Sequence, residues 1–340
     1  MRFCSLSPLL FLFLIPRILF AQPVAQITIG WWNMENVFDC VDDPGSGDDE
    51  YLPQGKKQWT QEKLHRKLLT LSRVINDMNP DVLGFCEVEH ESLIDSLLKY
   101  VPRKYGKVYY ESSDRRGIDM GMIYDKSKFS LVDSKKHPIP TKGRPTREII
   151  EISLSYLPLF YKGEGRGEVL HFLLNHWPSR LGGQLESEPR RLIAAAIARR
   201  IIDDILAKDS TARIIVLGDF NDEPFDRSIS EVLRASGKIT QVKTANDLFN
   251  STIHFVQEKK GTHYYSGKWS VIDQIIISRS LLVSGSLVIA DTSSIMLFKR
   301  DYMLSKSGQP LPFSRGGCSD HLPILLPLFV KERVWVRSSK

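Results

Sequence analysis

The sequence predicts an α/β protein in which a two-layered β core is flanked by helices. Three observations support this class. Short runs rich in β-branched and aromatic residues recur along most of the chain, as expected for strands. Two long segments instead carry apolar residues at helical spacing. No low-complexity tract, repeat or polar break divides the 340 residues, 42% of which are hydrophobic, so they fit one large domain.

The first 21 residues form a segment of their own. Arg2 precedes an unbroken apolar run at residues 9–15, and Ala21 is a small residue suited to signal-peptidase cleavage. The run is too short to span a bilayer. We therefore predict a signal peptide at residues 1–21, one domain at residues 22–340, a secreted or periplasmic protein, and no stable membrane anchor.

Export changes how the charges and cysteines count. Without Arg2 and Arg17 the formal net charge falls from +6 to +4, which suits a polyanionic substrate but lacks the dense basic tracts typical of nucleic-acid binding. Three cysteines remain, Cys40, Cys86 and Cys318, so at most one internal disulfide can form. We expect the protein to be a monomer.

The first third of the chain predicts strand, helix, strand. Residues 26–33 are apolar and β-branched and predict the first strand. Thr60 is a suitable N-cap for a helix, whose apolar face recurs at helical spacing and which Asn79-Pro80 ends. Residues 81–88 form a short apolar run typical of a strand buried on both faces.

An acidic segment separates the first strand from this helix. It runs from residue 39 to residue 55, and its spacing matches no EF-hand calcium loop. We predict a solvated surface loop. The acidic residues that we expect to be solvated are Asp42, Asp43, Asp48, Asp49 and Glu50.

The rest of the chain is richer in strands than in helices. A second long helix is expected at residues 189–207, with Pro189 in its first turn, and a shorter one at residues 227–235. The remaining apolar runs predict strands at residues 107–111, 117–124, 129–132, 147–156, 169–177, 213–217, 270–278, 287–290 and 323–329.

Four of the predicted strands end in residues that can bind a metal or transfer a proton. These endings are Asn33-Met34-Glu35, Glu87-Val88-Glu89, Gly218-Asp219-Phe220-Asn221 and Ser319-Asp320-His321. A single ending of this kind is usually only a turn or a cap. Carboxylates at several strand ends, however, can converge on one hard divalent cation, which prefers oxygen ligands.

Taken together and in this order, the motifs resemble the endonuclease/exonuclease/phosphatase superfamily, the DNase I-like enzymes. Besides the four endings, the resemblance rests on Arg116-Gly117-Ile118-Asp119, on Asn175-His176-Trp177-Pro178-Ser179-Arg180 and on Asp273. It spans nearly the whole mature chain. It implies a four-layer α/β sandwich, with two mixed, mainly antiparallel sheets packed face to face and helices outside.

The resemblance also implies a role for each matched residue. Glu87 is expected to be the principal metal ligand, supported by Asn33, Glu35 and Asp320. The expected ion is Mg²⁺, with Mn²⁺ or Ca²⁺ as alternatives, because Mg²⁺ tolerates few protein ligands and keeps several waters.

Proton transfer is assigned to a second group of matched residues. His321, oriented by Asp273, is expected to act either as a general base or as a cationic clamp on the phosphate. Asp219 is expected to align or deprotonate the attacking water, and Asn221 to donate hydrogen bonds to the phosphoryl oxygens. His176 is interpreted as a second phosphate-contacting histidine.

Three more residues are predicted to bind the substrate. They are Arg116, Asn175 and Arg180, of which Arg180 has the geometry to hold phosphate through two donors. We expect a phosphodiester substrate, DNA or RNA. The alternatives are a lipid or small-molecule phosphoesterase, sphingomyelinase-like or a phosphatase, and a non-catalytic binding member of the family.

Overall fold

The computed structural model describes residues 26–141, 145–156, 168–283, 287–289 and 293–330. The predicted signal peptide, residues 1–21, lies outside these ranges, as does Ala290 at the end of one predicted strand. In the part of the chain that is described, no helix has the length and the apolar character needed to cross a membrane.

The first of two large sheets contains seven strands within the described residues. Strand β1 lies at its centre, parallel to β2 and antiparallel to β16. In spatial order six of the strands are β14 (Leu287–Val288), β16 (Ile324–Val330), β1 (Gln26–Val37), β2 (Val82–Val88), β4 (Asp119–Asp125) and β3 (Tyr105–Tyr110). The seventh, β15 (Met296–Leu297), pairs with β16 outside this order.

The second sheet also has seven strands in the described part of the chain. Its central pair, β7 and β8, is parallel, and β13 runs antiparallel to β8. In spatial order the strands are β5 (Phe129–His137), β6 (Ile149–Tyr156), β7 (Glu168–His176), β8 (Arg213–Asp219), β13 (Asp273–Ser278), β10 (Leu248–Asn250) and β9 (Ala235–Ser236).

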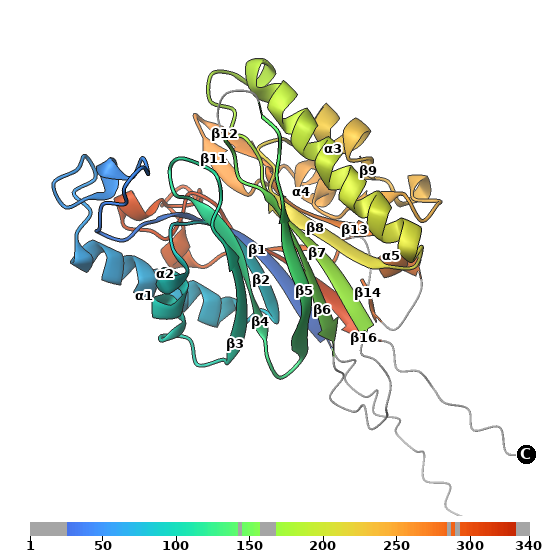
Figure 1. Cartoon of the computed structure of the whole chain (residues 1–340), viewed down its shortest axis with the longest axis horizontal. Coiled ribbons are helices and arrows are strands. Elements are labelled where there is room, and N and C mark those ends of the chain that lie inside the picture. Colours follow the sequence, from blue (N-terminus) through green and yellow to red (C-terminus); the bar gives the residue numbers. More distant parts are fainter. Residues whose placement is uncertain (1–25, 142–144, 157–167, 284–286, 290–292, 331–340) are drawn as a thin grey trace, which may run out of the picture.

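The two sheets pack face to face, as Figure 1 shows. Alternation along β1 explains why: Ile29 and Trp31 point into the core between the sheets, whereas Trp32 points to the opposite face. The contact is close at Gly84 of β2, where an added Cβ would lie 2.9 Å from the Trp31 ring and 3.0 Å from Leu217 on the other sheet. A side chain there would force the sheets apart.

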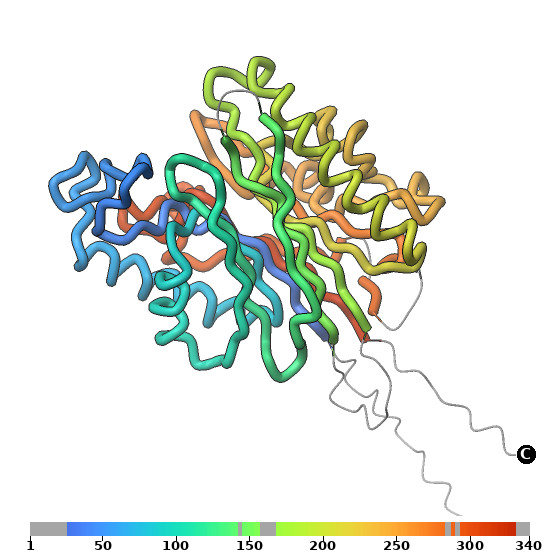
Figure 2. The backbone as a smooth tube through the Cα atoms, in the orientation of Figure 1, coloured from blue at the N-terminus to red at the C-terminus, as the bar shows by residue number. Residues whose placement is uncertain are grey.

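Helices cover the outer faces of both sheets. α1 (Gln61–Met78) and α2 (Glu91–Leu98) bury their apolar sides against the first sheet, and α3 (Gln184–Lys208) against the second. The tube in Figure 2 shows the blue β1 beside the red β16, so the two ends of the described chain share one sheet. This confirms the predicted four-layer α/β sandwich with two mixed, mainly antiparallel sheets.

Several predicted elements need correction. α3 begins at Gln184 and not at Pro189, which lies one turn inside it. The helix predicted at residues 227–235 is a π-helical turn, Ser228–Val232. The strand predicted at residues 270–278 is divided, because β12 (Lys268–Ser270) pairs with β11 (His263–Tyr265) in a separate hairpin. α2 was not predicted, because its eight residues make only about two turns, although Leu93, Ile94 and Leu97 lie on one buried face.

The remaining elements are short. They are η1 (Asp49–Tyr51), η3 (Ile239–Gln241), α4 (Ile253–Gln257), α5 (Ser280–Val283), η4 (Asp301–Met303) and η5 (Phe313–Arg315). The acidic segment before α1 is solvated at Asp42 and Asp49, as predicted. At Asp48 the prediction is wrong, because this residue is buried.

Candidate active site

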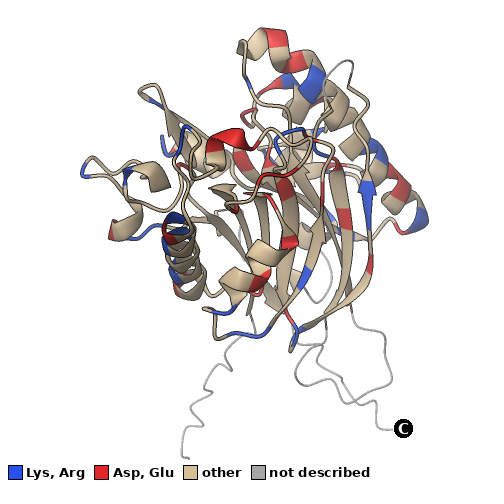
Figure 3. Cartoon of the chain, turned by 60° about the vertical axis from the view of Figure 1, so that its left-hand side comes forward, with Lys and Arg blue, Asp and Glu red and all other residues tan. Residues whose placement is uncertain are grey.

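The predicted site residues meet at one edge of the two sheets. The strand register accounts for this, because β8 places Asp219 opposite His176 of β7 on one side and opposite Asp273 of β13 on the other. On the first sheet, Asn33 of β1 lies beside Cys86, the neighbour of Glu87 in β2. Acidic positions gather among the loops at this end of the sheets in Figure 3.

The backbone at this edge adopts unusual conformations. Glu35, Asn36, Glu87 and Asn221 have positive φ angles of 55°, 50°, 64° and 51°. Left-handed backbone at a non-glycine residue costs about 1–3 kcal/mol and is common at functional sites. Part of this cost is offset here, since the Asn36 N–H donates to Glu87 Oε2 at 3.0 Å and the Glu35 N–H to Asn33 Oδ1 at 2.9 Å.

Asn33 joins the two sheets at the site. Its Nδ2 atom donates to Glu87 Oε1 and to Asp219 Oδ2, both at 3.1 Å. Its side chain is buried, as is that of Asp219. The amide therefore links a carboxylate of each sheet: that of Asp219 is buried, and that of Glu87 is partly exposed.

His321 and Asp273 form a short, buried ion pair. His321 Nδ1 lies 2.7 Å from Asp273 Oδ2, and the other oxygen of Asp273 accepts the Trp31 indole N–H at 3.1 Å. Burial alone would lower the pKa of His321, but the carboxylates of Asp273 and Asp320 outweigh it and hold that pKa well above its usual value. His321 is therefore a cation whose Nε2 faces the site.

Asp219 lies between the two predicted histidines. Its Oδ2 atom is 3.8 Å from His176 Nε2 and 4.0 Å from His321 Nε2. Burial raises the pKa of Asp219 to about 7, and the nearby charge of Asp273 adds to this rise. A carboxylate with such a pKa can accept a proton near neutral pH.

His176 is electrostatically the opposite of His321. Burial lowers the pKa of His176 well below its usual value, and the positive charge of Arg147 lowers it further, so the ring is neutral. Arg147 was not predicted as a site residue. It is buried and its guanidinium donates to the backbone oxygens of His176 and Trp177 at 3.1 and 2.8 Å, while Asp114 pairs with it at 2.7 Å. Arg147 thus positions the His176 turn.

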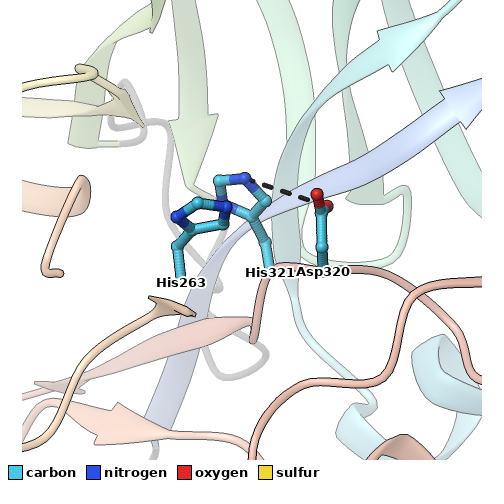
Figure 4. Close-up of side chains that lie close together, drawn as sticks. All are labelled: His263, Asp320 and His321. Carbon is cyan, nitrogen blue, oxygen red and sulfur yellow. Dashed lines mark ion pairs between the residues drawn. The ribbon is translucent and has the colours of Figure 1, made fainter. Parts of the chain in front are cut away.

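His263 is a second residue that the sequence did not reveal. Its ring lies 4.5 Å from that of His321, and Figure 4 shows the two rings side by side with Asp320 turned toward His321. Burial lowers the pKa of His263 to about 3, and the charge of His321 acts in the same direction. The Leu322 N–H donates to Thr262 O at 2.7 Å, which fixes the strand of His263 against the His321 segment.

The predicted metal ligands form one acidic group, whose charge Lys67 and His321 compensate only in part. Burial raises the pKa of Glu35 and of Asp320, and the charge of Glu87 contributes to both shifts. Lys67, fully buried, lies 3.7 Å from Glu35. Such crowding of carboxylates is chemically suited to a divalent cation.

Three-residue sets with ligand atoms within 4.8 Å of one another also occur here. At this edge of the sheets one set is His263, Asp320 and His321, and another is Asp219, Asp273 and His321. Glu87 and Glu35 belong to neither set. An ion at Glu87 would therefore take most of its other ligands from Asn33 and water, which is the usual environment of Mg²⁺.

The predicted substrate-binding residues are more dispersed. Arg116 is exposed and pairs with Asp114 at 3.2 Å. Arg180 donates to Asn221 O at 2.6 Å and pairs with Asp226 at 2.9 Å, so its charge is partly compensated within the chain. Their contact with substrate stays a prediction.

Asn175 and Asn221 are both tied to Trp177. Asn175 is fully buried and accepts the Trp177 indole N–H at 2.9 Å, so in the structure it positions that ring rather than facing an open site. Asn221 donates to Trp177 O at 3.1 Å through Nδ2 and, through its backbone N–H, to Asp219 Oδ1 at 3.0 Å. Asn221 thus lies directly beside Asp219.

The cysteines take no part in the site. Cys40, Cys86 and Cys318 are all free thiols in the structure. Burial raises the pKa of the Cys86 thiol well above its usual value and that of Cys318 to about 11, so both stay protonated and unreactive. No pair among these three forms the single disulfide that their number would allow.

Two mixed sheets packed between helices, with polar side chains gathered at one shared edge, define a DNase I-like α/β sandwich. The chain belongs to the endonuclease/exonuclease/phosphatase family, whose model matches residues 28–330. Members of this family are phosphoester hydrolases and typically depend on a divalent metal.

Individual relatives are distant. The Protein angel of Drosophila melanogaster is 21% identical over 216 residues, which are 63% of this chain and 58% of that protein. The chain therefore matches little more than half of that relative.

Among solved structures, the human Nocturnin catalytic domain with bound sulfate is 17% identical, with a TM-score of 0.56 over 90% of this chain and 95% of the other. Truncated Caenorhabditis elegans TDP2 is 15% identical, with a TM-score of 0.57 and coverage of 90% and 98%. The mannosyl-6-phosphatase of Bacteroides thetaiotaomicron is 14% identical, with a TM-score of 0.54 and coverage of 89% and 99%. At these identities the likeness establishes the fold.

Proposed function

We propose that the chain is an exported, divalent-metal-dependent hydrolase of phosphodiesters, with DNA or RNA as its substrate class. One observation carries the proposal. The His321–Asp273 pair and the Asn33 amide that joins Glu87 to Asp219 meet at one junction of the two sheets. A proton-handling group thus lies beside a carboxylate suited to a hard cation.

We assign the metal to Glu87, supported by Asn33, Glu35 and Asp320. The left-handed backbone at Glu87 and its two hydrogen-bond donors fix the carboxylate, while the acidic surroundings supply the charge that a cation needs. A bound divalent ion, Mg²⁺ in the first instance, would neutralise the phosphoryl oxygens. All other tasks fall to side chains of the chain itself.

Because its pKa is raised, His321 carries a proton on both ring nitrogens: Nδ1–H donates to Asp273 Oδ2, and Nε2–H faces the site. As a cation it is suited to donating a hydrogen bond to a phosphoryl oxygen and to protonating the departing oxygen. This favours the clamp and acid role over that of a general base. The neutral His176 offers a second donor on the other side of Asp219.

Asp219 is then the group suited to accepting the proton of the attacking water. Its raised pKa, about 7, lets it hold that proton near neutral pH. Asn221 lies next to it and carries an uncharged amide, which can donate to phosphoryl oxygens without repelling them.

A row of rings supports a nucleotide-containing substrate. His263 stacks near His321 at 4.5 Å, and the Tyr265 ring lies 6.2 Å from His263 at an interplanar angle of 13°. Tyr265 is 75% exposed. Nucleobases stack on exposed aromatic rings regardless of sequence, so this hairpin offers them a platform leading to the catalytic histidine.

A second candidate is a phosphatase that acts on monoesters of small molecules. The observation in its favour is the likeness of the fold to the Bacteroides mannosyl-6-phosphatase. A non-catalytic role is disfavoured, since Glu87, Asp219, Asp320 and His321 are all present.

A substrate panel distinguishes these functions. Purified protein is incubated with plasmid DNA, single-stranded RNA, bis(p-nitrophenyl) phosphate and p-nitrophenyl phosphate, with Mg²⁺, Mn²⁺ or a chelator. We expect metal-dependent cleavage of the nucleic acid and of the simple diester, with the monoester at least about tenfold slower in kcat/KM. Preferred hydrolysis of the monoester would favour the phosphatase, and no hydrolysis with any metal would refute both candidates.

Export is tested separately. When the full chain is produced in a secreting bacterial host, we expect the mature protein outside the cytoplasm with Gln22 as its first residue. N-terminal sequencing that finds residue 1 on the functional protein would contradict the proposed signal peptide.

A further inference from the structure

A second group of carboxylates lies outside the candidate active site, where the acidic segment after β1 packs on the end of β2. Asp43, Asp48 and Glu89 each place one carboxylate oxygen within 4.8 Å of the others. Asp43 is partly exposed, whereas Asp48 and Glu89 are only 1% and 2% exposed. Two of the three acids are therefore removed from water.

Each buried acid has one oxygen bound within the chain and one without a partner. Asp48 Oδ2 accepts the Asp43 N–H at 3.1 Å, and Glu89 Oε2 accepts the Asp39 N–H at 2.7 Å. Asp48 Oδ1 and Glu89 Oε1 are buried and make no hydrogen bond, and the same is true of Ser46 Oγ. Buried carboxylate oxygens are costly unless a donor or a cation satisfies them.

These unsatisfied atoms come from segments that pack on one glycine. A Cβ added to Gly117 would lie 2.9 Å from Ser46 Oγ and 3.8 Å from Glu89 Cγ. The Gly47 N–H donates to Arg115 O at 2.6 Å and holds the two loops together. The acidic segment, the end of β2 and the loop before β4 thus surround one polar spot.

The chain supplies little positive charge to this spot. His90 Nε2 lies 2.7 Å from Asp43 Oδ2, on the most exposed of the three acids. Among the described residues, neither Asp48 nor Glu89 forms an ion pair with a lysine or an arginine. Three carboxylates in one place without such a partner leave an excess of negative charge.

We propose that Asp43, Asp48 and Glu89 bind a Ca²⁺ ion, with the Ser46 hydroxyl as a further ligand. All four groups offer oxygen, the donor that this hard cation requires. Ca²⁺ accepts about six to eight oxygen ligands in a flexible geometry, whereas Mg²⁺ demands a near-ideal octahedron and usually keeps several of its waters. Several protein oxygens gathered from separate loops, two of them on acids buried from water, therefore suit Ca²⁺ better than Mg²⁺.

The ion would fasten the rim of the active site. Glu89 follows Glu87 by two residues, and Gly117 follows Arg116 directly. A Ca²⁺ ion here would hold the acidic segment against both, in place of a disulfide that the free cysteines do not provide. The site uses none of the residues assigned to catalysis, so it stands whether or not the proposed function holds.

Thermal unfolding of the full chain tests the proposal. The Glu87→Gln background removes the principal ligand assigned in the active site, so that the remaining calcium effect reports on the second site. We expect saturating CaCl₂ to raise the Tm of this background by about 5 °C, with a smaller shift in MgCl₂. Adding Asp48→Asn abolishes the calcium shift, whereas Asp42→Asn, an equal charge change at an exposed position of the same segment, retains it.

A crystal of the unmodified chain grown with CaCl₂ provides a test that needs no variant to fold. We expect an anomalous peak between Asp43, Asp48 and Glu89, with oxygens at about 2.3–2.6 Å. The proposal is overturned if that position holds no calcium, or if the calcium shift in Tm is the same with and without Asp48→Asn.

Discussion

The two sheets contribute different chemistry to the same edge. The first sheet supplies Asn33 of β1 and Glu87 at the end of β2, groups whose oxygens suit a cation. The second supplies Asp219 and Asp273, each within 4.0 Å of a histidine nitrogen. His321 precedes β16 of the first sheet yet pairs with Asp273 of the second.

This difference teaches that neither sheet holds a site by itself. The Asn33 amide and the His321–Asp273 pair are two of the contacts that cross from one sheet to the other. Both need the two sheets to lie face to face, as they do in close contact at Gly84. Activity should therefore respond to changes on either sheet, but for different reasons.

The largest effect is expected from the proton-handling side. His321→Ala removes the cation that faces the phosphate, and kcat/KM for a diester should fall by about 10³–10⁴-fold. Steady-state kinetics at saturating metal measure this loss. The control is His65→Ala, which removes an exposed histidine of α1 and should leave the rate unchanged. A loss of less than tenfold in His321→Ala would contradict its role.

A smaller effect, of a different kind, is expected from the metal side. Glu87→Gln keeps the shape of the side chain but loses the charge, so activity at limiting Mg²⁺ should fall by about 10²–10³-fold. Because the defect lies in metal affinity, raising the metal concentration should restore part of the rate, which it cannot do for His321→Ala. Glu111→Gln, at an exposed position, is the control. Equal metal dependence in Glu87→Gln and the parent would argue against Glu87 as a ligand.

The free energy of unfolding should depend on pH through Asp119, a buried carboxylate of the first sheet that has no histidine partner. Asp119 of β4 accepts from the Ser112 N–H at 2.7 Å and from the Tyr109 hydroxyl at 2.9 Å, and burial raises its pKa from 3.8 to about 6. A raised folded-state pKa gives stability that is complete below pH 3.8 and is lost as the pH rises through 6.

At pH 8 the buried Asp119 is ionised, and at pH 4 it is largely protonated. The change in the free energy of unfolding caused by Asp119→Asn should therefore be about 1–3 kcal/mol more favourable at pH 8 than at pH 4. Urea unfolding at both pH values measures the difference, with the exposed Asp133→Asn as the control. A gain that does not depend on pH would show that Asp119 carries no such cost.

The smallest effect is expected at the aromatic hairpin. Tyr265→Ala removes the outermost ring of the row and should raise the KM for single-stranded nucleic acid about fivefold to tenfold. The KM for bis(p-nitrophenyl) phosphate, which is too short to span the row, should change little. Tyr100→Ala, a half-exposed tyrosine after α2, serves as the control. An equal change in KM for both substrates would contradict a stacking role for Tyr265.

The sequence predicted the residues that lie at the ends of long strands. Glu87, Asp219 and Asp320-His321 each follow or precede an apolar run, so their place at one edge could be inferred from the alternation of strand and helix. His263 could not be found in this way, because it lies in a three-residue strand with no periodic signal. Arg147 resembles any solvated arginine in sequence, and only the fold buries it against the His176 turn.

The acidic segment marks another limit of sequence reasoning. The spacing of Asp43 and Asp48 matches no EF-hand loop, and the third carboxylate comes from Glu89, about forty residues later. Their proximity depends on how the loops pack around Gly117, which no local pattern encodes.

A double-mutant cycle between Glu87→Gln and His321→Ala tests most directly whether the two sheets form one catalytic site. If both residues serve the same transition state, their effects on kcat/KM are not independent, and the double variant should be no more than about tenfold slower than the slower single variant. A loss equal to the product of the two single losses would contradict the account, because it would mean that Glu87 and His321 act independently.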